Sequence, residues 1–588
     1  MEPIIGIDLG TTNSEVACII DSNARIIENG DRGILPSCVG LDPDGKIIVG
    51  VEAKNQAVIA PERTILSVKR LMGSDDKIVL DGNAYLPQEI SAFILKALKA
   101  RAEKDIGKPI SKAIITVPAY FTDAQRQATR EAGAIAGLEV VRIINEPTAA
   151  ALAYENTNSE TRKILVYDLG GGTFDVSIVK IENKIVEVLA STGDNKLGGD
   201  DFDRKIMDAL ADHCETNLKL KVKDNLTIMA RLRRAAEKAK ITLSAEPYAK
   251  IEEDHIGKKL LKAVHLSYEL SRTQFEEMIE EDVTKTNDAV SKALKDASLL
   301  PSDIDKIILV GGSTRIPRIS SMLEERFGKK PHGEIDPDLC VALGAAMQSG
   351  REMGMDNSSV LLDVTPYTFG TSAVGELNGM PAMTMFVPLI HRNTKLPARR
   401  SEAFGTIVDN QIGTDIRIFQ GEKPDALDNI EIGMYKFKLT KAPAGSVIVL
   451  NFDLDINGIL KIRAVEKMSG KHVDAVIENA FSAFDEKEMV ASRKKIDSEW
   501  SEGNEDILGT DFQPQTEDND TSSSQDITPE TASILEKSAA LLDTVTDEEK
   551  DDIINLMEDI RDAAEEKRED DVKKLIGELE DILYYYQD

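Results

Sequence analysis

The sequence predicts a multidomain chain in which a two-lobed α/β region is followed by an antiparallel β domain and then by α-helices. Three observations predict this order. A glycine-rich strand–turn–strand pattern occurs twice among the first 355 residues, apolar and polar residues alternate after residue 366, and apolar residues recur at helical spacing near the C-terminus. A chain of 588 residues is long enough to bury several separate cores.

The composition disfavours several classes of protein. A net charge of −32 argues against nucleic acid as a partner, because a phosphate backbone repels such a chain. No run approaches the roughly 18 apolar residues of a membrane helix, and Met1 is followed by a strand-like segment rather than a secretory signal. Cys18, Cys38, Cys214 and Cys340 stand singly, without zinc-site or disulfide spacing. We therefore expect a cytoplasmic protein with reduced thiols and neither nucleic acid nor membrane as a partner.

The α/β region contains an internal repeat. The segments Asp8–Val16 and Asp168–Val176 each end a strand in Asp-Leu-Gly, cross a turn of small residues and resume as an apolar strand. The interval from Asp to Val is eight residues in both copies, which lie 160 residues apart. Such a repeat predicts two similar lobes that face each other. The alternative is a chance similarity between two glycine-rich hairpins.

The turns of this repeat are suited to binding phosphates. Small residues let the backbone approach an anion, and successive N–H groups of a tight turn point at its oxygens. Gly10–Asn13 is suited to one end of a triphosphate and Gly170–Thr173 to the other, whereas a Walker-type motif is absent from the sequence.

Three acidic residues, Asp8, Asp168 and Asp175, lie at the edges of these turns. Carboxylates placed there are suited to hold Mg²⁺ through water molecules, because Mg²⁺ gives up its bound waters reluctantly. A third glycine segment, Leu309–Arg315, is suited to pack against a base and ribose, or else it is a plain turn from a strand into a helix.

From residue 367 to about residue 480 apolar and polar residues alternate, which is a period of two residues. Leu450, Phe452 and Leu454 alternate with polar residues, Asn457-Gly458 follows, and the alternation resumes at Leu460. Asn-Gly between two alternating runs is the strongest short-range signal for a hairpin. The region is therefore predicted to be an antiparallel β domain.

The C-terminal part is predicted to be helical, with one interruption. A helix is expected from about Asp485 to Trp500. Residues 501–527 hold eight acids and no bases and are expected to be disordered, because they cannot bury enough apolar surface. Thr546 and Glu549 then form a capping box ahead of apolar stripes at helical spacing. These stripes favour the core of a small helical bundle, and a docking face for an outside helix is the alternative.

Several motifs resemble a known family. The segments Gly6–Ser14, Asp168–Asp175 and Ile308–Pro317 resemble the three signatures of the 70-kDa heat-shock chaperones of the DnaK type. Thr116–Phe121 and Ile144–Tyr154 extend the resemblance, which covers residues 4 to about 470. Short phosphate motifs alone would fit any actin-like ATPase, but the Glu-Pro-Thr-Ala-Ala-Ala run followed by a β domain favours the chaperone branch.

The resemblance implies an actin-like ATPase domain with two α/β lobes, then an antiparallel β-sandwich that binds peptides, then an α-helical lid. The expected boundaries are 1–356 for the nucleotide-binding domain, 357–366 for the interdomain linker, 367–480 for the β-sandwich, 481–500 for the lid helix, 501–527 for the acidic disordered segment and 528–588 for the helical lid bundle. The short span between Gly73 and Pro87 resembles compact bacterial members. The alternative that the chain is a divergent paralogue of this bacterial form is left open by the sequence.

The resemblance also implies the roles of the nucleotide-site residues. Lys69 is expected to contact the γ-phosphate and orient the attacking water, Glu146 to lie near that water, and Thr173 to touch the γ-phosphate. Asp8, Asp168 and Asp175 are expected around Mg²⁺ and its associated cations, with K⁺ as the second expected cation. The other expected nucleotide-binding residues are Gly10, Thr11, Thr12, Asn13, Gly170, Gly171, Gly172, Gly199, Glu237, Lys240, Ser244, Gly311, Gly312, Ser313, Arg315 and Asp338.

Two positions of the nucleotide site depart from the family pattern. Ile241 replaces an arginine that is often stacked on the base in relatives. Asn195 stands where some members carry a threonine that becomes phosphorylated, so this modification is not expected here.

The linker is expected to act as a switch. Its apolar residues, among them Leu361 and Leu362, forgo about 1.5–3 kcal/mol each when left in water. They form either a permanently docked edge strand or a segment that docks in the ATP state and is released after hydrolysis. The resemblance favours the second, with Pro118, Arg126 and Asp363 in the relay between the domains.

The client site is expected to differ from that of relatives. Phe404, Ile416 and Ile418 match the apolar cradle for an extended peptide. Thr414 stands at the pocket floor where relatives carry valine, and Ile407 at the arch where alanine is usual. The segment 370–389 is also about eight residues longer than a short connecting loop of the family.

The function implied is that of an ATP-dependent chaperone that couples slow, partner-stimulated ATP hydrolysis to capture and release of client polypeptides. The implied partners are unfolded or extended polypeptides, a J-domain cochaperone and a nucleotide exchange factor of the GrpE type. A weakly hydrolysing, nucleotide-gated scaffold and a specialised paralogue with a restricted client are the alternatives. An actin-like sugar kinase is disfavoured by the β domain and the linker.

Overall fold

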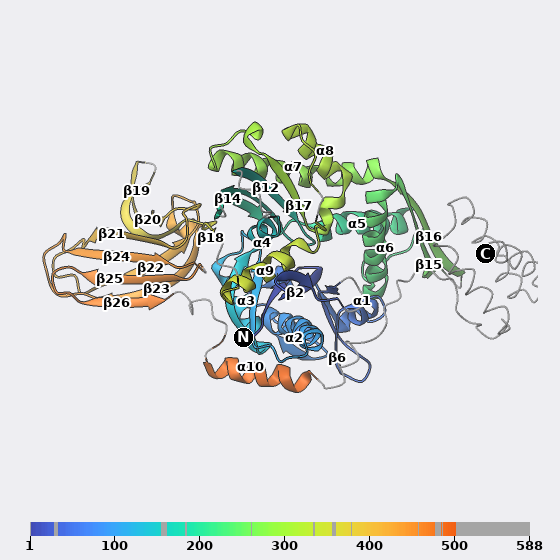
Figure 1. The fold of residues 1–588 in the computed structure, drawn as a ribbon, viewed down its shortest axis with the longest axis horizontal. Helices are drawn as coiled ribbons and strands as arrows, with labels where there is room; N and C mark the ends of the chain where they lie inside the picture. The colour runs from blue at the N-terminus through green and yellow to red at the C-terminus, as the bar shows by residue number, and fades with distance from the viewer. Residues whose placement is uncertain are drawn as a thin grey trace, which may run out of the picture. The chain divides into compact units, whose positions relative to one another are not determined.

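The computed structural model describes residues 2–500, except 29–32, 155–160, 183–184, 260–261, 333–334, 356–359, 378, 457, 477–483 and 485. The predicted acidic segment 501–527 and helical bundle 528–588 lie outside the described residues. The described part consists of a mixed α/β region, then antiparallel β sheets, then one helix (Figure 1). The predicted fold class is thereby confirmed as far as the description extends.

The first lobe of the α/β region is built on a sheet in the order β11-β10-β1-β2-β3, with β4 beside β2. Its strands are β1 (Ile4–Asp8), β2 (Asn13–Ile20), β3 (Asn23–Ile26), β4 (Ile34–Pro36), β10 (Lys112–Val117) and β11 (Glu139–Asn145). β1 and β2 form an antiparallel hairpin in which Asp8 is opposite Glu15. β10 pairs in parallel with β1. Helices α2 (Pro87–Ile106) and α3 (Asp123–Ile135) contribute Phe93 and Ala132 to the core of this lobe.

The second lobe repeats this arrangement in the order β17-β12-β13-β14-β18. Its strands are β12 (Arg162–Leu169), β13 (Phe174–Glu182), β14 (Ile185–Asp194), β17 (Lys306–Val310) and β18 (Val360–Leu362). In the β12–β13 hairpin Asp168 is opposite Asp175, and β17 pairs in parallel with β12. The predicted internal repeat is therefore confirmed as two equivalent hairpins, each with a parallel strand beside it.

Two helices join the lobes. α9 (Cys340–Glu352) contacts β1 and β2 of the first sheet, α4 (Glu146–Ala153) contacts β12 and β13 of the second, and the two helices contact each other. A Cβ atom at Gly344 would lie 1.7 Å from the carbonyl oxygen of Ala149. Because only glycine permits so close an approach, this residue sets the distance between the two helices.

Smaller elements complete both lobes. In the first lobe they are α1 (Val51–Gln56), β5 (Cys38–Leu41), β6 (Ile47–Val49), β7 (Thr64–Leu66), the 3₁₀ helix η2 (Val68–Leu71), β8 (Ile78–Leu80) and β9 (Asn83–Tyr85). In the second they are α5 (Gly199–Thr216), α6 (Leu226–Ala245), β15 (Tyr248–Lys259), β16 (Lys262–Ser271), α7 (Arg272–Asp296), the 3₁₀ helix η4 (Gly312–Arg315) and α8 (Pro317–Phe327).

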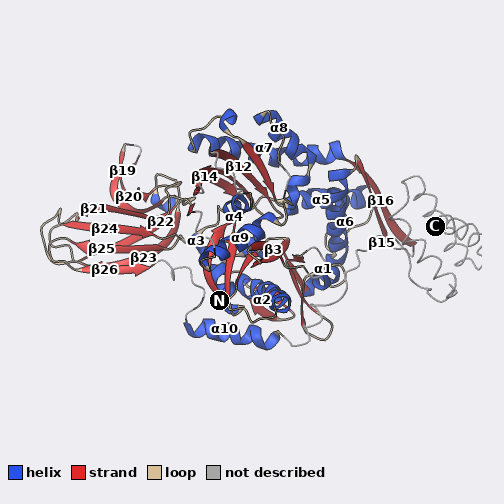
Figure 2. Cartoon of the chain, viewed as in Figure 1, coloured by secondary structure: helices blue, strands red, loops and turns tan. Residues whose placement is uncertain are grey.

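The β domain has two four-stranded sheets, ordered β20-β19-β22-β23 and β21-β24-β25-β26, and is drawn almost wholly as red strands in Figure 2. The strands are β19 (Phe369–Leu377), β20 (Met380–Ile390), β21 (Ala398–Gly405), β22 (Gly413–Gln420), β23 (Ile430–Lys438), β24 (Val447–Leu454), β25 (Leu460–Glu466) and β26 (His472–Val476). Side chains of both sheets, such as Ile418 and Phe452, share one buried core. The Asn-Gly signal marks a hairpin as predicted, since Leu454 pairs with Leu460. The enlarged segment 370–389 lies within the β19–β20 hairpin.

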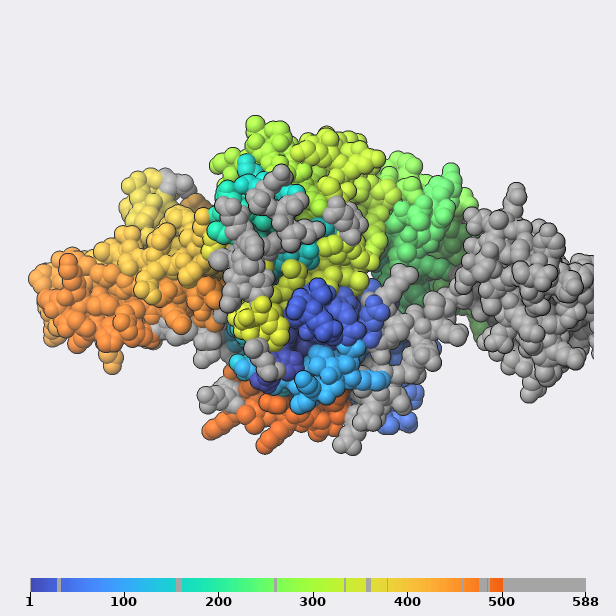
Figure 3. Space-filling view, in the orientation of Figure 1, coloured from blue at the N-terminus to red at the C-terminus, as the bar shows by residue number. Residues whose placement is uncertain are grey.

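Helix α10 (Glu486–Glu499) follows the β domain and packs on the first lobe, where Figure 3 draws it in orange. Ser492 Oγ donates a hydrogen bond to Glu89 Oε1 at 2.7 Å, and Trp500 stacks on Phe93 with ring centroids 6.5 Å apart. Across the described stretches of the chain, the helices lack the combination of length and apolar character that a membrane span requires.

Candidate functional site

A cavity of about 330 Å³ lies between the lobes, and both glycine hairpins line it. Most of the predicted nucleotide-site residues line this one cavity. They are Asp8, Gly10, Thr11, Thr12, Asn13, Lys69, Glu146, Asp168, Gly170, Gly171, Thr173, Glu237, Lys240, Gly311, Gly312, Ser313, Arg315 and Asp338. The structure thus brings together residues that are separated by up to 330 positions in the sequence.

Four predicted residues lie next to the cavity rather than in its lining. A Cβ atom at Gly172 would lie 2.6 Å from Thr11 Cγ2, so this glycine lets the two hairpins meet. The amide of Gly199 donates to the carbonyl of Gly170 at 2.9 Å. Ser244 Oγ donates to the carbonyl of Lys240 at 3.1 Å, and Asp175 is buried behind the β12–β13 turn.

The two hairpin turns touch at the base of the cavity. A Cβ atom at Gly171 would lie 1.8 Å from Thr12 Oγ1, so a side chain at this position would collide with the opposite turn. Thr12 Oγ1 is buried and has no hydrogen-bond partner among the described residues. A buried hydroxyl without a partner costs free energy, so this atom is available to bind a ligand that enters between the turns.

A buried ion pair lies beside the turns. Lys69, from η2, donates a hydrogen bond from Nζ to Glu146 Oε1 at 2.6 Å, and both side chains are less than a tenth exposed. Burial lowers the pKa of Lys69, but the charges of Glu146 and Asp8 outweigh it and raise this pKa above its ordinary value. Lys69 is therefore a fixed positive charge with a fixed carboxylate beside it.

Three further carboxylates surround this pair. Asp8 accepts a hydrogen bond from Thr116 Oγ1 at 2.8 Å, and Asp175 accepts from the amides of Ala119 and Tyr120 at 3.0 and 3.1 Å. Burial, reinforced by the charge of Glu146, raises the pKa of Asp8 to about 7 and the pKa values of Asp168 and Asp175 well above the ordinary value. The positive charge of Lys69 lowers these pKa values but does not outweigh burial and the charge of Glu146.

The donor set therefore fits a hard cation. Asp8, Glu146, Asp168 and Asp175 set four carboxylates against the single ammonium of Lys69. Within the described ranges, no three metal-ligating side chains come close enough to hold an ion directly. A cation bound here would thus be held partly by water and by ligand oxygens, which is how Mg²⁺ is usually bound beside phosphates.

Another part of the cavity wall is formed by α6 and by the segment after β17. Glu237, Lys240 and Ile241 from α6 line the cavity together with the Gly311–Arg315 segment, whose Ser313 Oγ donates to the carbonyl of Gly170 at 2.9 Å. Ile241 is 62% exposed and presents an apolar surface. The charged groups here are already paired, Lys240 with Asp203 at 2.7 Å and Arg315 with Asp338 at 2.8 Å.

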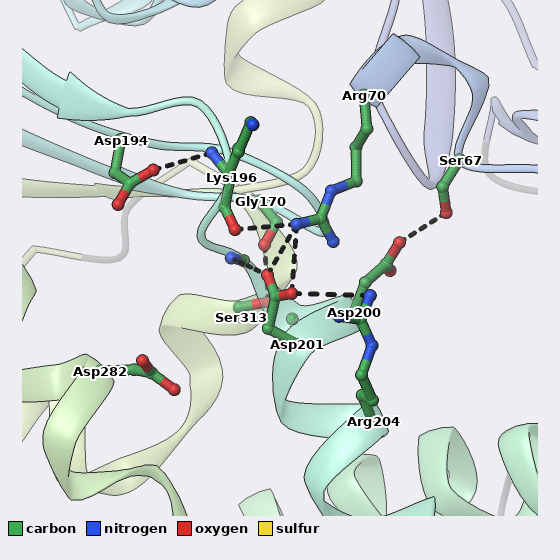
Figure 4. Close-up of polar contacts among 12 residues, drawn as sticks. Ser67, Arg70, Gly170, Asp194, Lys196, Asp200, Asp201, Arg204, Asp282 and Ser313 are labelled. Carbon is green, nitrogen blue, oxygen red and sulfur yellow. Dashed lines mark hydrogen bonds and ion pairs between the residues drawn. The ribbon is translucent and has the colours of Figure 1, made fainter.

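Polar contacts hold the lobes together beside the cavity (Figure 4). Arg70 Nη2 of the first lobe donates to Asp201 at 3.1 Å and to the carbonyl of Lys196 at 2.8 Å in the second. Ser67 donates to Asp200 at the start of α5. These contacts of Ser67 and Arg70 with the second lobe hold the segment that carries Lys69 in place.

The expected relay residues are also brought together. Asp363 accepts hydrogen bonds from Asn145 Nδ2 at 2.8 Å and from Thr148 Oγ1 at 3.2 Å. Arg126 donates to Asn145 Oδ1 at 2.7 Å and to the carbonyl of Ala119, next to Pro118, at 3.0 Å. Leu361 and Leu362 lie in β18, which adds to the edge of the second lobe through pairing with β14.

The five expected peptide-binding residues lie in different environments. Ile416 and Ile418 are part of the core of the β domain, and Phe404 packs against that core from a half-buried position. Thr414 is half-buried, and Ile407 is 59% exposed. Of these five, Ile407 is therefore the residue that offers most apolar surface.

Sequence reasoning missed Glu15 and the apolar residues Val310, Pro337 and Val341, which also line the cavity. The apolar residues carry no signal, because a sequence does not tell which buried side chain faces a cavity. Glu15 did carry a signal in the sequence, because it occupies the same place in the first copy of the repeat as Asp175 does in the second.

A family model described as Hsp70 protein matches residues 4–587 of the chain. The chain is 41% identical to the chaperone protein DnaK of Thermosipho africanus over 591 residues, which cover 98% of this chain and 95% of that protein. It is 45% identical to the chaperone protein DnaK of Thermotoga neapolitana over 510 residues, which cover 85% of this chain and 84% of that protein.

The chain therefore belongs to the Hsp70 family, a family of ATPases. Within this class it is an ATP-dependent chaperone of the DnaK type. The resemblance inferred from the motifs is confirmed.

Proposed function

We propose that the cavity between the lobes is the site at which this chaperone binds ATP or ADP, which the Hsp70 family binds. The polyphosphate lies along the two glycine turns, where backbone N–H groups and Thr12 Oγ1 meet its oxygens. The base lies at the other end, against Ile241 and the Gly311–Arg315 segment. The lining of the cavity supports this placement, because both glycine turns, Ile241 and residues of the Gly311–Arg315 segment line the same cavity.

The observation that carries the catalytic role is the buried pair of Lys69 and Glu146, 2.6 Å apart at the cavity wall. Phosphoryl transfer to water depends on positioning and charge neutralisation more than on a strong base. Lys69 Nζ donates to the terminal phosphate and to the attacking water, and Glu146 holds Lys69 in place and accepts a hydrogen bond from that water. Thr173 contacts the same phosphate from the second lobe.

Mg²⁺ is proposed to be held through water by Asp8, Asp168 and Asp175, with K⁺ as a second cation. The cation would neutralise the charge that the phosphates and the carboxylates share. The hydrogen bonds from Thr116, Ala119 and Tyr120 fix the orientation of two of these carboxylates before the ligand binds.

The linker is proposed to transmit the state of this site to the β domain. Asp175 accepts from the amides of Ala119 and Tyr120, Arg126 donates to the carbonyl of Ala119, and Asp363 of the linker meets Arg126 through Asn145. This series of contacts supports a route from the phosphate end of the cavity, past Pro118, to Leu361 and Leu362.

The β domain is proposed to bind extended apolar segments of client polypeptides, with Phe404, Ile407, Thr414, Ile416 and Ile418 at its site. A J-domain cochaperone that stimulates hydrolysis, a GrpE-type exchange factor and action in the cytoplasm are proposed by family membership. The domain boundaries given above, including the nucleotide-binding domain 1–356 and the linker 357–366, are part of the same proposal.

Single-turnover hydrolysis tests the catalytic assignment. We expect Lys69→Ala to bind ADP as the wild type does and to hydrolyse ATP roughly 100- to 1000-fold more slowly, the usual effect of losing one preorganised donor. Lys205→Ala is the matched control, because Lys205 pairs with Asp282 at 2.6 Å and does not line the cavity. Hydrolysis at the wild-type rate in Lys69→Ala would refute the assignment.

A further inference from the structure

Two of the six histidines of the chain lie next to each other on the hairpin of β15 and β16. They are His255 and His265, whose ring centroids are 4.9 Å apart. Neither residue lines the cavity between the lobes, so the binding and hydrolysis of ATP give them no role. Imidazole is a ligand that suits Zn²⁺, Cu²⁺ and Ni²⁺, and the pair is therefore a candidate site for such an ion.

The distance between the two rings fits a single shared ion. A metal–nitrogen bond to imidazole is about 2.0–2.1 Å long, and the ligands of a tetrahedral ion are about 109° apart. Two imidazoles on one ion therefore have ring centroids about 5 Å apart. His255 and His265 already have this spacing, and their rings are tilted by 54° instead of being stacked in parallel.

Asp254 orients one of the two rings. Its Oδ1 atom lies 2.7 Å from His265 Nδ1, and this hydrogen bond holds the pKa of Asp254 below its ordinary value, so the carboxylate is ionised and accepts the bond. In the neutral ring the proton is therefore on Nδ1, and Nε2 keeps its lone pair for a metal. A carboxylate behind a histidine is the usual arrangement in metal sites, because it fixes the tautomer and the orientation of the ligand.

The stretch of β15 that carries His255 is held by the neighbouring helix α6. The register of the hairpin shifts between Glu253 and Gly257, and His255 lies in this irregular stretch with a φ of 49°, which is uncommon for a residue other than glycine. Arg231 of α6 donates to the carbonyl of His255 at 3.2 Å and to Glu253 Oε2 at 2.7 Å. The backbone that places the His255 ring beside His265 is thus anchored to a helix.

We propose that His255 and His265 bind one divalent transition-metal ion of the Zn²⁺ or Cu²⁺ class, with Asp254 as the positioning residue behind His265. Water fills the other coordination positions, consistent with the absence of three convergent ligands in the ranges that the structure describes. The four cysteines, which would otherwise compete for such an ion, are buried. An ion at this site joins β15 to β16 across the irregular stretch.

The test measures metal affinity by calorimetry on the full, untagged chain with Zn²⁺ alone or Cu²⁺ alone, in a buffer with excess Mg²⁺ to occupy the acidic cavity. We expect the wild type to bind Cu²⁺ more tightly than Zn²⁺. Asp254→Asn should weaken binding about tenfold, at the lower end of the effect of such partners because Asp254 is exposed. His255→Asn, which tolerates the left-handed backbone, and His265→Gln should weaken it further.

Electron paramagnetic resonance of the Cu²⁺ complex counts the ligands directly. The wild type and Asp254→Asn should show coupling to two imidazole nitrogens, and each histidine variant should show at most one. His213→Ala is the matched control, because His213 lies on α5 of the same lobe with its ring 5.1 Å from that of Tyr268. It should bind both ions as the wild type does.

Equal Cu²⁺ affinity in the wild type and in both histidine variants would overturn the site. A wild-type spectrum with fewer than two imidazole nitrogens would also overturn it, and this spectrum decides the question even where a variant fails to fold. Unfolding without metal is compared across the variants, so that the effect of Asp254→Asn on metal affinity is separated from an effect on stability. Wild-type metal affinity in Asp254→Asn would overturn the positioning role of Asp254.

Discussion

Replacing Lys69 with methionine should destabilise the protein as well as slow its chemistry. Methionine has a similar length and no charge, so Lys69→Met leaves Glu146 buried without its partner. Removing one member of a buried ion pair typically costs about 3–5 kcal/mol. The surroundings make the upper half of this range the expectation, because Asp8, Asp168 and Asp175 are buried nearby and lose their closest positive charge.

A double-mutant cycle isolates this effect. Unfolding is followed for wild type, Lys69→Met, Glu146→Gln and the double variant, without nucleotide and with cations held constant. The double variant should recover most of the stability, because no unpaired charge is left in the cavity wall, yet it should hydrolyse ATP no faster than Lys69→Met. Wild-type stability in Lys69→Met, or a double variant less stable than either single one, would refute the electrostatic reasoning.

Two more predictions concern the linker and the dependence on pH. The double variant Leu361→Asp and Leu362→Asp places charges in β18, so ATP should no longer weaken client binding, whereas basal hydrolysis should be unchanged. The expected loss is the whole coupling between ATP and peptide binding, about 5- to 150-fold in affinity. Peptide affinity measured with and without ATP tests this, and ATP-driven peptide release that stays intact in the variant would contradict it. Burial raises the pKa of Asp123 to about 7, whereas in the unfolded chain it is near 4. The folded state therefore holds a proton that the unfolded chain releases between about pH 4 and 7, and stability falls as pH rises through this window. In Asp123→Asn the loss of unfolding free energy between pH 5 and pH 8 should be smaller than in the wild type by on the order of 1–2 kcal/mol. Denaturation at the two pH values measures this loss. An equal loss in the two proteins would contradict the prediction.

The motifs predicted the lobes well because their chemistry is local. A turn that lets backbone N–H groups meet a phosphate needs glycines and small residues at fixed spacing, and both Gly10–Asn13 and Gly170–Thr173 carry that requirement in the sequence. The alternation around Leu450 and Leu460 specified a hairpin for the same reason, since one face of the strands must be buried. Elsewhere local patterns were insufficient. The segment 370–389 reads as an enlarged loop, but the chain pairs it as β19 and β20, because Gly379 at a φ of 80° permits a tight turn between them.

The sequence by itself determined the order of the domains, the two phosphate turns and the acids at their edges, because spacing within a turn or a strand fixes these features. The tertiary structure alone decided which distant side chains meet: Lys69 with Glu146, the linker with β14, and Glu15 with the nucleotide cavity. Such contacts depend on how sheets and helices pack across long stretches of chain, and the burial that follows from this packing changes what each carboxylate can do. A glutamate in a strand is ordinary in a sequence, and it becomes chemically significant only when the fold closes an acidic cavity around it.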